Sequence, residues 1–228
     1  IRTMSAHVNP DIVEDGLVLC LDAANKKSYT GTGTTWTDRS GNNLNGSLIN
    51  SPTFSSDNNG NFSFDATNES VSIAETSILN LQSYTYAFWI KRTQAQSGNW
   101  MQILQRSTSN RNPGIWFYIN EISRLHFSIK LSSGSAPSVN PGGFSLNEWH
   151  YFTASVEYTG GNTIMKGYTD TVYNSGSTTS GAYPTLGTGS SFVGKYGLHI
   201  ANLKIYNRAL DQTEIIQNYN ATKSRFEI

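Results

Sequence analysis

The sequence predicts an all-β fold in which two antiparallel sheets form a sandwich, with one short helix near the C-terminus. Ser, Thr, Asn and Gly supply 95 of the 228 residues and charged residues only 14%, which favours strands and turns over helices. Short runs of β-prone residues recur with turn signals between them and without regular alternation of strand and helix. Aromatic residues make up 12% of the chain and provide enough apolar area for a core.

The expected strands are short and follow one another along most of the chain. They cover residues 17–23, 62–66, 69–74, 83–93, 101–106, 114–120, 124–130, 149–158, 163–170, 190–195 and 199–207. The runs at 62–66 and 69–74 are separated by Thr67 and Asn68, and we expect them to form a hairpin. No internal repeat or linker divides the chain. We therefore expect one sandwich domain over residues 12–228, preceded by an arm or linker at residues 1–11.

The single expected helix lies near residues 212–219. Asp211 is a suitable N-cap, and Glu214 three residues later would complete a capping box. The apolar face that should dock on the sandwich consists of Leu210, Ile215, Ile216 and Tyr219. Asn220 is expected to end the helix in a left-handed conformation.

Composition also excludes several classes of partner. Acidic and basic residues number 16 each, and without a basic run the chain is not expected to bind nucleic acid. No stretch approaches the run of about 18 apolar residues that a membrane helix needs. The lone Cys20 is expected in the core rather than in a disulfide. Because the chain begins with Ile1, we expect it to be a piece of a longer protein.

Residues typical of catalysis do not form a recognisable pattern. His7, His126, His150 and His199 lack the spacing of metal ligands, and the chain has no G-x-S-x-G motif. No expected strand carries acidic residues at i and i+2 or i+4, the spacing that would place two carboxylates on one sheet face for glycoside hydrolysis. We therefore expect no catalytic residue and no cofactor.

The loop at residues 38–46, DRSGNNLNG, concentrates side-chain oxygen atoms. A hard cation such as Ca²⁺ could use them as ligands. The alternative is a turn in which Asp and Asn side chains bond to their own backbone. We favour the turn, so that a weak Ca²⁺ site near Asp38 is the secondary interpretation.

Six segments follow one another in the order of a known family. They are GLVLCLDAANKKSY, TTWTDRSGNNLNGSL, FSFDATNESVSI, YTYAFWIKR, LNEWHYFTASVE and HIANLKIYNRALDQTEIIQNYNATKSRF. Over roughly residues 12–226 this order resembles a laminin-G-like domain, which has the concanavalin A-like jelly-roll fold. With its GLVLCLDA opening and KSRF ending, the chain is similar to versions carried by virion proteins of tailed phages.

The resemblance implies a jelly roll whose first strand lies near its last, and binding of glycans or proteins rather than catalysis. Many members hold Ca²⁺ through an acidic residue just ahead of the strand that leads into IYN. Here Ala201 and Asn202 occupy that place, and an Asn carbonyl is a poorer ligand than a carboxylate. We therefore expect no tightly held Ca²⁺ there, although a weak site near Asn202 stays open.

The resemblance makes loop aromatics the candidates for a glycan or partner site, because a ring face can stack on sugar C–H groups. The candidates are Trp36, Trp100, Trp116, Tyr118, Tyr183 and Tyr196. Packing in the core or rim is the alternative for each of them. Trp89 and Trp149 lie in the middle of expected strands and are expected in the core.

The hypothesis from the sequence is a non-catalytic interaction module on the virion surface, as a capsid decoration or a tail or fibre appendage. Its expected partners are other virion proteins and host-surface glycans, contacted by a homo-oligomer or array, because many copies compensate for weak single sites. The first alternative is a carbohydrate-binding module of a secreted bacterial enzyme. A glycoside hydrolase with this fold is the second alternative.

Overall fold

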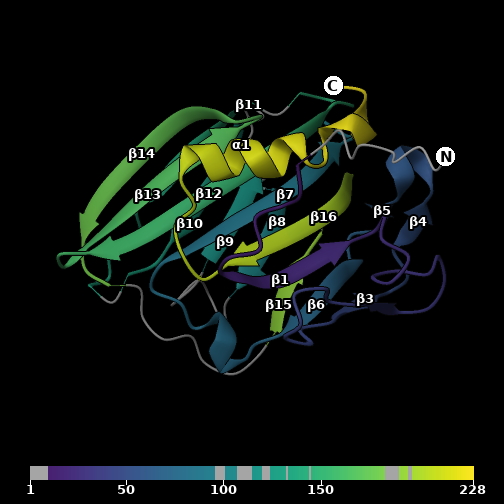
Figure 1. Ribbon diagram of the computed structural model, residues 1–228, viewed down its shortest axis with the longest axis horizontal. Coiled ribbons are helices and arrows are strands. Elements are labelled where there is room, and N and C mark those ends of the chain that lie inside the picture. The colour runs from purple at the N-terminus through teal and green to yellow at the C-terminus, as the bar shows by residue number, and fades with distance from the viewer. Residues whose placement is uncertain are drawn as a thin grey trace, which may run out of the picture.

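The computed structural model describes residues 10–95, 101–106, 115–119, 124–131, 133–143, 145–182, 190–194 and 197–228. Two antiparallel sheets face each other, and one α-helix lies across the outer face of the first sheet (Figure 1). This confirms the predicted two-sheet sandwich with a short C-terminal helix. The helix is too short to cross a membrane, as are the other helical turns of the described residues.

The first sheet, sheet A, has the order β14-β13-β12-β7-β16-β5-β4, and β1 pairs with the free part of β16. Its strands are β1 (Leu17–Asp22), β4 (Thr53–Ser55), β5 (Asn61–Phe64), β7 (Tyr84–Arg92), β12 (Trp149–Thr159), β13 (Asn162–Thr169), β14 (Val172–Ser180) and β16 (Leu198–Tyr206). The pairing of β1 with β16 is antiparallel, with Leu21 opposite Leu203. The expectation that the first strand lies beside the last is therefore confirmed.

The second sheet, sheet B, has the order β11-β10-β9-β8-β15-β6-β3-β2. Its strands are β2 (Thr35–Trp36), β3 (Gly46–Ile49), β6 (Ser70–Ala74), β8 (Met101–Arg106), β9 (Ile115–Ile119), β10 (Arg124–Ile129), β11 (Ser138–Gly143) and β15 (Ser190–Val193). The helices are α1 (Gln212–Asn220) and the single 3₁₀ turns η1 (Asp57–Asn59), η2 (Ser77–Leu79) and η3 (Lys223–Phe226).

The expected hairpin around Thr67 and Asn68 is wrong. β5 pairs with β16 and β4 in sheet A, while β6 pairs with β15 and β3 in sheet B. The two runs therefore stand in opposite layers, and the residues between them cross from one sheet to the other. A two-residue spacing between apolar runs fits either arrangement, so the sequence pattern could not distinguish them.

β7 is buried on both faces and joins two separate cores. Its inward-facing residues, which contribute to the core between the sheets, are Tyr84, Tyr86, Phe88 and Ile90. Its outward-facing Ala87 and Trp89 lie in a second core between sheet A and the C-terminal segment. Trp89 stacks on Phe226 of η3 with ring centroids 4.2 Å apart, and its Nε1 donates to Thr222 Oγ1 at 2.8 Å.

The helix docks on this second core by a face that differs in part from the predicted one. Asp211 and Glu214 form the expected capping box, and Ile215 is fully buried. Ile216, however, is 38% exposed, whereas Asn218 is fully buried. The prediction that Ile216 packs inward is therefore wrong.

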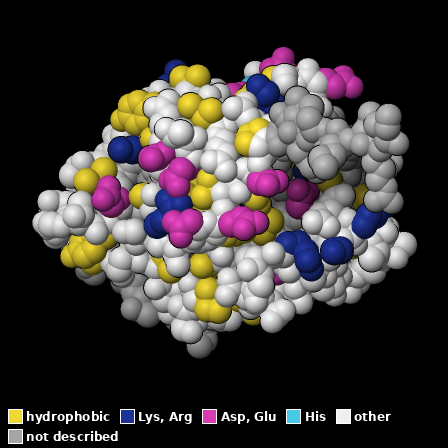
Figure 2. All heavy atoms as spheres, viewed as in Figure 1, with side chains coloured by type: hydrophobic (Ala, Val, Ile, Leu, Met, Phe, Trp, Pro, Cys, Tyr) yellow, Lys and Arg dark blue, Asp and Glu magenta, His cyan; other side chains and the backbone are white. Residues whose placement is uncertain are grey.

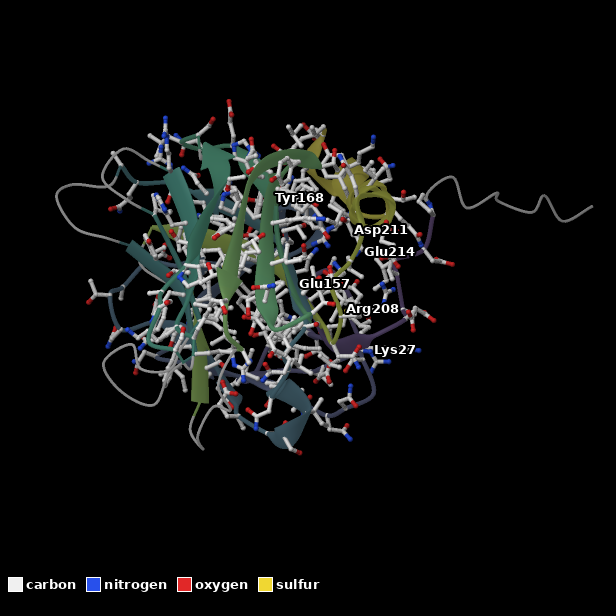
Figure 3. The ribbon with its side chains drawn as sticks, turned by 90° about the vertical axis from the view of Figure 1, so that its left-hand side faces the viewer. Lys27, Glu157, Tyr168, Arg208, Asp211 and Glu214 are labelled. Carbon is white, nitrogen blue, oxygen red and sulfur yellow. The ribbon has the colours of Figure 1, made fainter. Side chains whose placement is uncertain are left out.

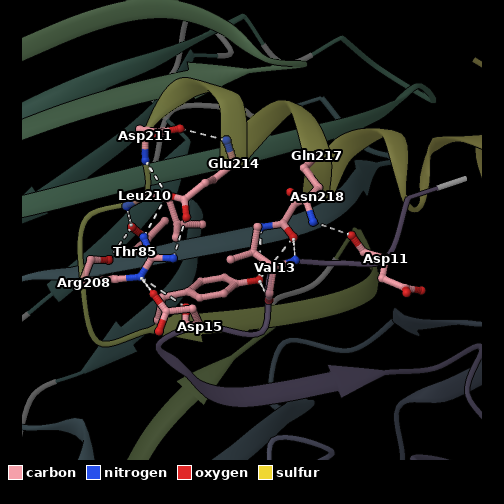
Figure 4. A network of polar contacts seen from close by, with 11 residues as sticks. Asp11, Val13, Asp15, Thr85, Arg208, Leu210, Asp211, Glu214, Gln217 and Asn218 are labelled. Carbon is pink, nitrogen blue, oxygen red and sulfur yellow. Dashed lines mark hydrogen bonds and ion pairs between the residues drawn. The ribbon is translucent and has the colours of Figure 1, made fainter.

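Polar groups beneath the helix explain the buried Asn218. Its Oδ1 accepts a hydrogen bond from the backbone N–H of Val13 at 2.9 Å, and its Nδ2 donates to the Tyr206 hydroxyl at 3.1 Å (Figure 4). Gln217 Nε2 donates to the carbonyl of Asp11 at 2.8 Å. The helix thus holds the N-terminal segment against sheet A as well as packing on it.

The helix also ends differently from the prediction. Asn220 does not adopt a left-handed conformation, and Ala221 continues right-handed at φ −61°. The chain then turns through η3, and Glu227 at φ 59° is the left-handed residue. Continuing through Ala221 and η3 brings Phe226 onto Trp89, and this contact favours the observed path over a left-handed helix end at Asn220.

Two polar side chains, Cys20 and Lys204, lie on the face of sheet A that carries the second core. Cys20 on β1 and Lys204 on β16 are direct cross-strand partners, and both are buried. Lys204 is only 1% exposed, and its Nζ has no hydrogen-bond partner among the described residues. Burial lowers the pKa of the Lys204 ammonium and raises the pKa of the Cys20 thiol, because each charged form is poorly solvated there.

Candidate functional site

The structure places three of the six predicted aromatic residues, and two of these are buried. Trp36 is 1% exposed and packs on Phe62 of the inner core with ring centroids 4.7 Å apart. Trp116 on β9 is 6% exposed. Core packing, the alternative weighed for each candidate, therefore describes Trp36, whose ring offers no open face to a ligand.

Tyr118 is half-buried on the outer face of sheet B. Its ring stacks on that of His126 on β10, with centroids 5.1 Å apart and planes 2° from parallel. Burial and the charge of Arg124 lower the pKa of His126, so its ring favours the neutral form. The remaining candidates, Trp100, Tyr183 and Tyr196, lie outside the described residues.

Phe192, which was not among the predicted aromatic residues, is the exposed aromatic residue in the described part of sheet B. Phe192 on β15 is 46% exposed, because its neighbours Ser191 and Val193 point into the sandwich. Across the sheet it lies opposite Ser72 on β6 and Gln105 on β8. The period-two alternation of SSFVGK could have indicated this, but it does not tell which of Phe192 and Val193 faces the core.

Phe192 borders a hollow of about 210 Å³, which we call the Phe192 hollow. Its lining residues are Thr67, Asn68, Glu69, Ser70, Ile103, Gln105, Phe192 and Gly194. Glu69 Oε2 accepts a hydrogen bond from the N–H of Ala66 at 3.0 Å, which fixes the carboxylate. The hollow thus combines one open ring face with amide, hydroxyl and carboxylate groups, and a small apolar floor at Ile103.

A second, larger hollow lies on the outer face of sheet A beside α1, and we call it the helix groove. Its volume is about 310 Å³, and it is lined by Ser83, Ser155, Glu157, Ile164, Lys166, Arg208, Ala209, Leu210 and Asp211. Figure 3 shows Glu157 on the sheet side of the groove and Arg208 and Asp211 on the loop before α1. None of the lining residues is aromatic.

Among the charged residues that line the helix groove, Arg208 forms ion pairs with two neighbours outside it, Glu214 and Asp15. Arg208 donates to Glu214 Oε2 at 2.8 Å and lies 2.8 Å from Asp15 Oδ2 (Figure 4). The hydrogen bond with Glu214 raises the pKa of Arg208, and the same bond lowers the pKa of Glu214. Acidic and basic side chains accordingly lie next to one another on this face (Figure 2).

The helix groove also brings together two carboxylates that sequence spacing could not pair, Glu157 and Asp211. Asp211 Oδ1 accepts the N–H of Glu214 at 2.9 Å as the helix cap. A carboxylate used in this way is poorly placed to act as the acid or base of glycoside hydrolysis. The pair therefore gives little support to catalysis.

The positions considered for Ca²⁺ are buried or satisfied by the protein. Asn202 is fully buried, and its Oδ1 accepts the N–H of Trp89 at 3.3 Å. The Asp38 carboxylate accepts from the N–H groups of Cys20 and Ser40, each at 2.9 Å. No group of three or more His, Cys, Asp or Glu residues that could hold a metal occurs in the described part of the chain.

The fold is thus an all-β sandwich whose outer faces carry two open hollows with largely polar linings. The sequence profile of the concanavalin A-like lectin/glucanases superfamily matches residues 65–216, more than half of the chain. The chain belongs to this superfamily. A search of curated proteins found no match.

Solved structures with the same fold include binding domains of clostridial toxins. The binding domain of Paraclostridial Mosquitocidal Protein 1 has a TM-score of 0.72 at 16% identity, covering 91% of this chain and 52% of that one. The binding domain of botulinum neurotoxin DC, in complex with SialylT, has a TM-score of 0.70 at 18% identity over 92% and 52%. The serotype D ligand binding domain, in complex with N-acetylneuraminic acid, has a TM-score of 0.67 at 15% identity over 91% and 51%. This chain spans about half the length of each.

Proposed function

We propose that this domain is a non-catalytic carbohydrate-binding module whose sugar site is the Phe192 hollow. The observation that carries the proposal is the exposed ring of Phe192 beside fixed polar groups. A sugar offers an apolar C–H face and a rim of hydroxyl groups, which match an aromatic face and planar polar side chains. Membership of a lectin fold supports the proposal, as do the toxin domains crystallised with sialic acid ligands.

The Phe192 hollow is a better candidate than the helix groove. In the helix groove Arg208 is paired with Glu214 and Asp15, so a neutral sugar would have to compete with these ion pairs for hydrogen bonds. In the Phe192 hollow, Gln105 lies directly across from the ring and can bond a hydroxyl at the edge of a stacked sugar. A shallow site of this kind binds weakly, so many copies on one assembly would raise its avidity.

The particle on which the copies would be presented is a further part of the proposal. The GLVLCLDA opening and KSRF ending support a tailed-phage virion surface, with other virion proteins as neighbours and host glycans as ligands. Antibodies against the domain should then label intact particles under the electron microscope. Labelling only of a secreted enzyme would favour the carbohydrate-binding module of such an enzyme.

The sugar site is tested with a glycan array that includes sialylated oligosaccharides, followed by titration of the best ligand. Phe192→Ala should weaken binding about tenfold, the loss of one ring-stacking contact. Phe192→Tyr should retain affinity because the ring face remains. Glu157→Gln, in the helix groove, is the matched control and should bind like the wild type.

Three results would contradict the proposal. Loss of binding in Glu157→Gln with normal binding in Phe192→Ala would move the site to the helix groove. Absence of binding to every glycan on the array would remove the carbohydrate function itself. Release of reducing ends from a polysaccharide would show instead that the domain is an enzyme.

A further inference from the structure

The outer edge of β14 differs from the other strand edges of the described sheets. β14 is the end strand of sheet A and pairs only with β13. It is nine residues long and contains no charged residue and no proline. Long, uncharged edges are prone to pair with another strand, and proteins normally protect them.

The other described edges carry such protection. β4 and β2 have three and two residues. β11 contains Pro141 and packs against β13 and β14. The outer edge of β1 is bonded to a loop, because Cys20 N–H donates to Asp38 Oδ1 and Arg39 N–H donates to the carbonyl of Cys20. β14 itself bonds to β11 through Asn174 and Ser175, but beyond them its stretch 176–180 has exposed residues at every second position and no such protection among the described residues.

The turns that flank β13 determine which backbone groups of β14 face outward. Both two-residue turns, 160–161 and 170–171, have positive φ at both central residues, as type I′ turns require. The flanking pair Thr169–Val172 is then hydrogen-bonded, and bonded and non-bonded pairs alternate from there along β13. Beyond Val172, the residues of β14 that bond to β13 are, by this alternation and the observed register, Ser175, Ser177 and Thr179.

The intervening residues Gly176, Thr178 and Ser180 therefore direct their N–H and C=O groups away from the sheet. All three residues are exposed. Their spacing of two is the spacing at which an antiparallel partner strand forms its hydrogen-bonded pairs. We call this row of backbone groups the β14 edge.

We propose that the β14 edge pairs with the same edge of a second copy of this chain, antiparallel and about a two-fold axis at Thr178. In that register Thr178 lies opposite Thr178 of the second copy, and Gly176 lies opposite Ser180 in both directions. The three residue pairs exchange about six backbone hydrogen bonds, two for each pair. A two-fold contact places a strand against its own copy, and an uncharged strand meets no like charge there.

The partner is a second copy because the edge complements itself. Gly176 and the small Ser180 occupy the two positions that face each other, so no bulky side chain opposes another. The pairing would join two copies of sheet A edge to edge. The dimer would then carry two Phe192 hollows. The pairing itself goes beyond the proposed function and does not depend on it.

Sedimentation equilibrium across the micromolar range tests the proposal, with wild type expected to show a monomer–dimer equilibrium. Thr178→Pro removes an outward N–H that makes no bond with the described residues of the monomer, so the fold should tolerate it. We expect it to weaken dimerisation at least about tenfold, because several paired bonds are lost. Thr178→Lys, which places two like charges in direct opposition, should do the same even if the proline variant misfolds.

Thr32→Lys is the matched control, since it adds the same charge to an exposed loop residue far from β14 in sequence, and it should dimerise like wild type. Circular dichroism melts at low concentration check that the variants are folded. Wild type that stays monomeric across the range would overturn the proposal. Unchanged dimerisation of Thr178→Lys would also overturn it, because the contact would then lie elsewhere.

Discussion

Replacing the buried Lys204 by methionine should stabilise the protein. Lys204 is 1% exposed, and its Nζ has no hydrogen-bond partner among the described residues. A buried polar group without a partner costs about 1–3 kcal/mol. Methionine has a similar length and no strong polar atom, so it can occupy the same space without that cost. We therefore expect Lys204→Met to raise the free energy of unfolding by about 1–3 kcal/mol at neutral pH.

The gain should also depend on pH in a defined direction. Burial lowers the pKa of Lys204 in the folded protein, whereas lysine in an unfolded chain has a pKa of about 10.4. Between these two values the unfolded chain binds more protons, so the unfolding free energy of wild type rises with pH in that window. Methionine removes this dependence. The advantage of Lys204→Met must therefore shrink as pH rises towards the pKa of unfolded lysine.

Urea unfolding at several pH values between 7 and about 10 measures both effects, and melting temperatures should follow at about 2–4 °C per kcal/mol. Lys166→Met is the matched control, because Lys166 is an exposed lysine on another strand of sheet A. Its effect should stay within about ±0.5 kcal/mol. A destabilised Lys204→Met, or a gain that grows with pH, would refute the reasoning and indicate that the amine is hydrogen-bonded in the folded protein.

Three further predictions concern other buried positions. Asp38→Ala should lower the unfolding free energy by about 2–4 kcal/mol in urea, because several buried N–H groups lose their acceptor; Asp38→Asn, which keeps one oxygen, should lose clearly less. Gly60→Ala should lower the melting temperature, because Gly60 has φ 135° and an added Cβ would clash with the Ala23 carbonyl oxygen. Gly33→Ala, with open space around the added Cβ, should have a smaller effect, and equal effects of the two changes would contradict this. The Cys20 thiol, whose pKa is raised by burial, should react with a thiol reagent only after unfolding, and fast labelling of native protein would show that the strand opens.

Most of the fold could be predicted because its central strands carry clear alternation. β7, β12 and β16 match their expected ranges to within a residue or two, since apolar residues face the core at a period of two. β14 was missed because VYNSGSTTS has almost no apolar residues, and an edge strand that buries little needs none. β11 was missed because Pro141 argues against a strand, although an edge position tolerates it.

For the candidate site, the sequence could predict the type of residue, an exposed aromatic ring, but not which residue provides it. An aromatic surface was expected, but Trp36 proved to be a core residue, and the exposed ring in the described part of sheet B is Phe192. Which of two neighbouring apolar residues faces outward depends on the register of β15 against β6 and β8. That register is set by contacts more than 80 residues apart along the chain, which local pattern does not record.

The layer formed by the N-terminal segment, α1 and η3 has a mechanical consequence. Asp11 and Val13 are bonded to α1, and Arg225 of η3 contacts Asp22 of β1 at 2.8 Å. Both ends of the described chain thus leave from one layer on one side of the sandwich (Figure 1). We expect tension applied between residues 10 and 228 to break the bonds of this layer before those of the two sheets. Separation of Phe226 from Trp89 would uncover the Trp89 ring, so a change in Trp fluorescence should report this first step.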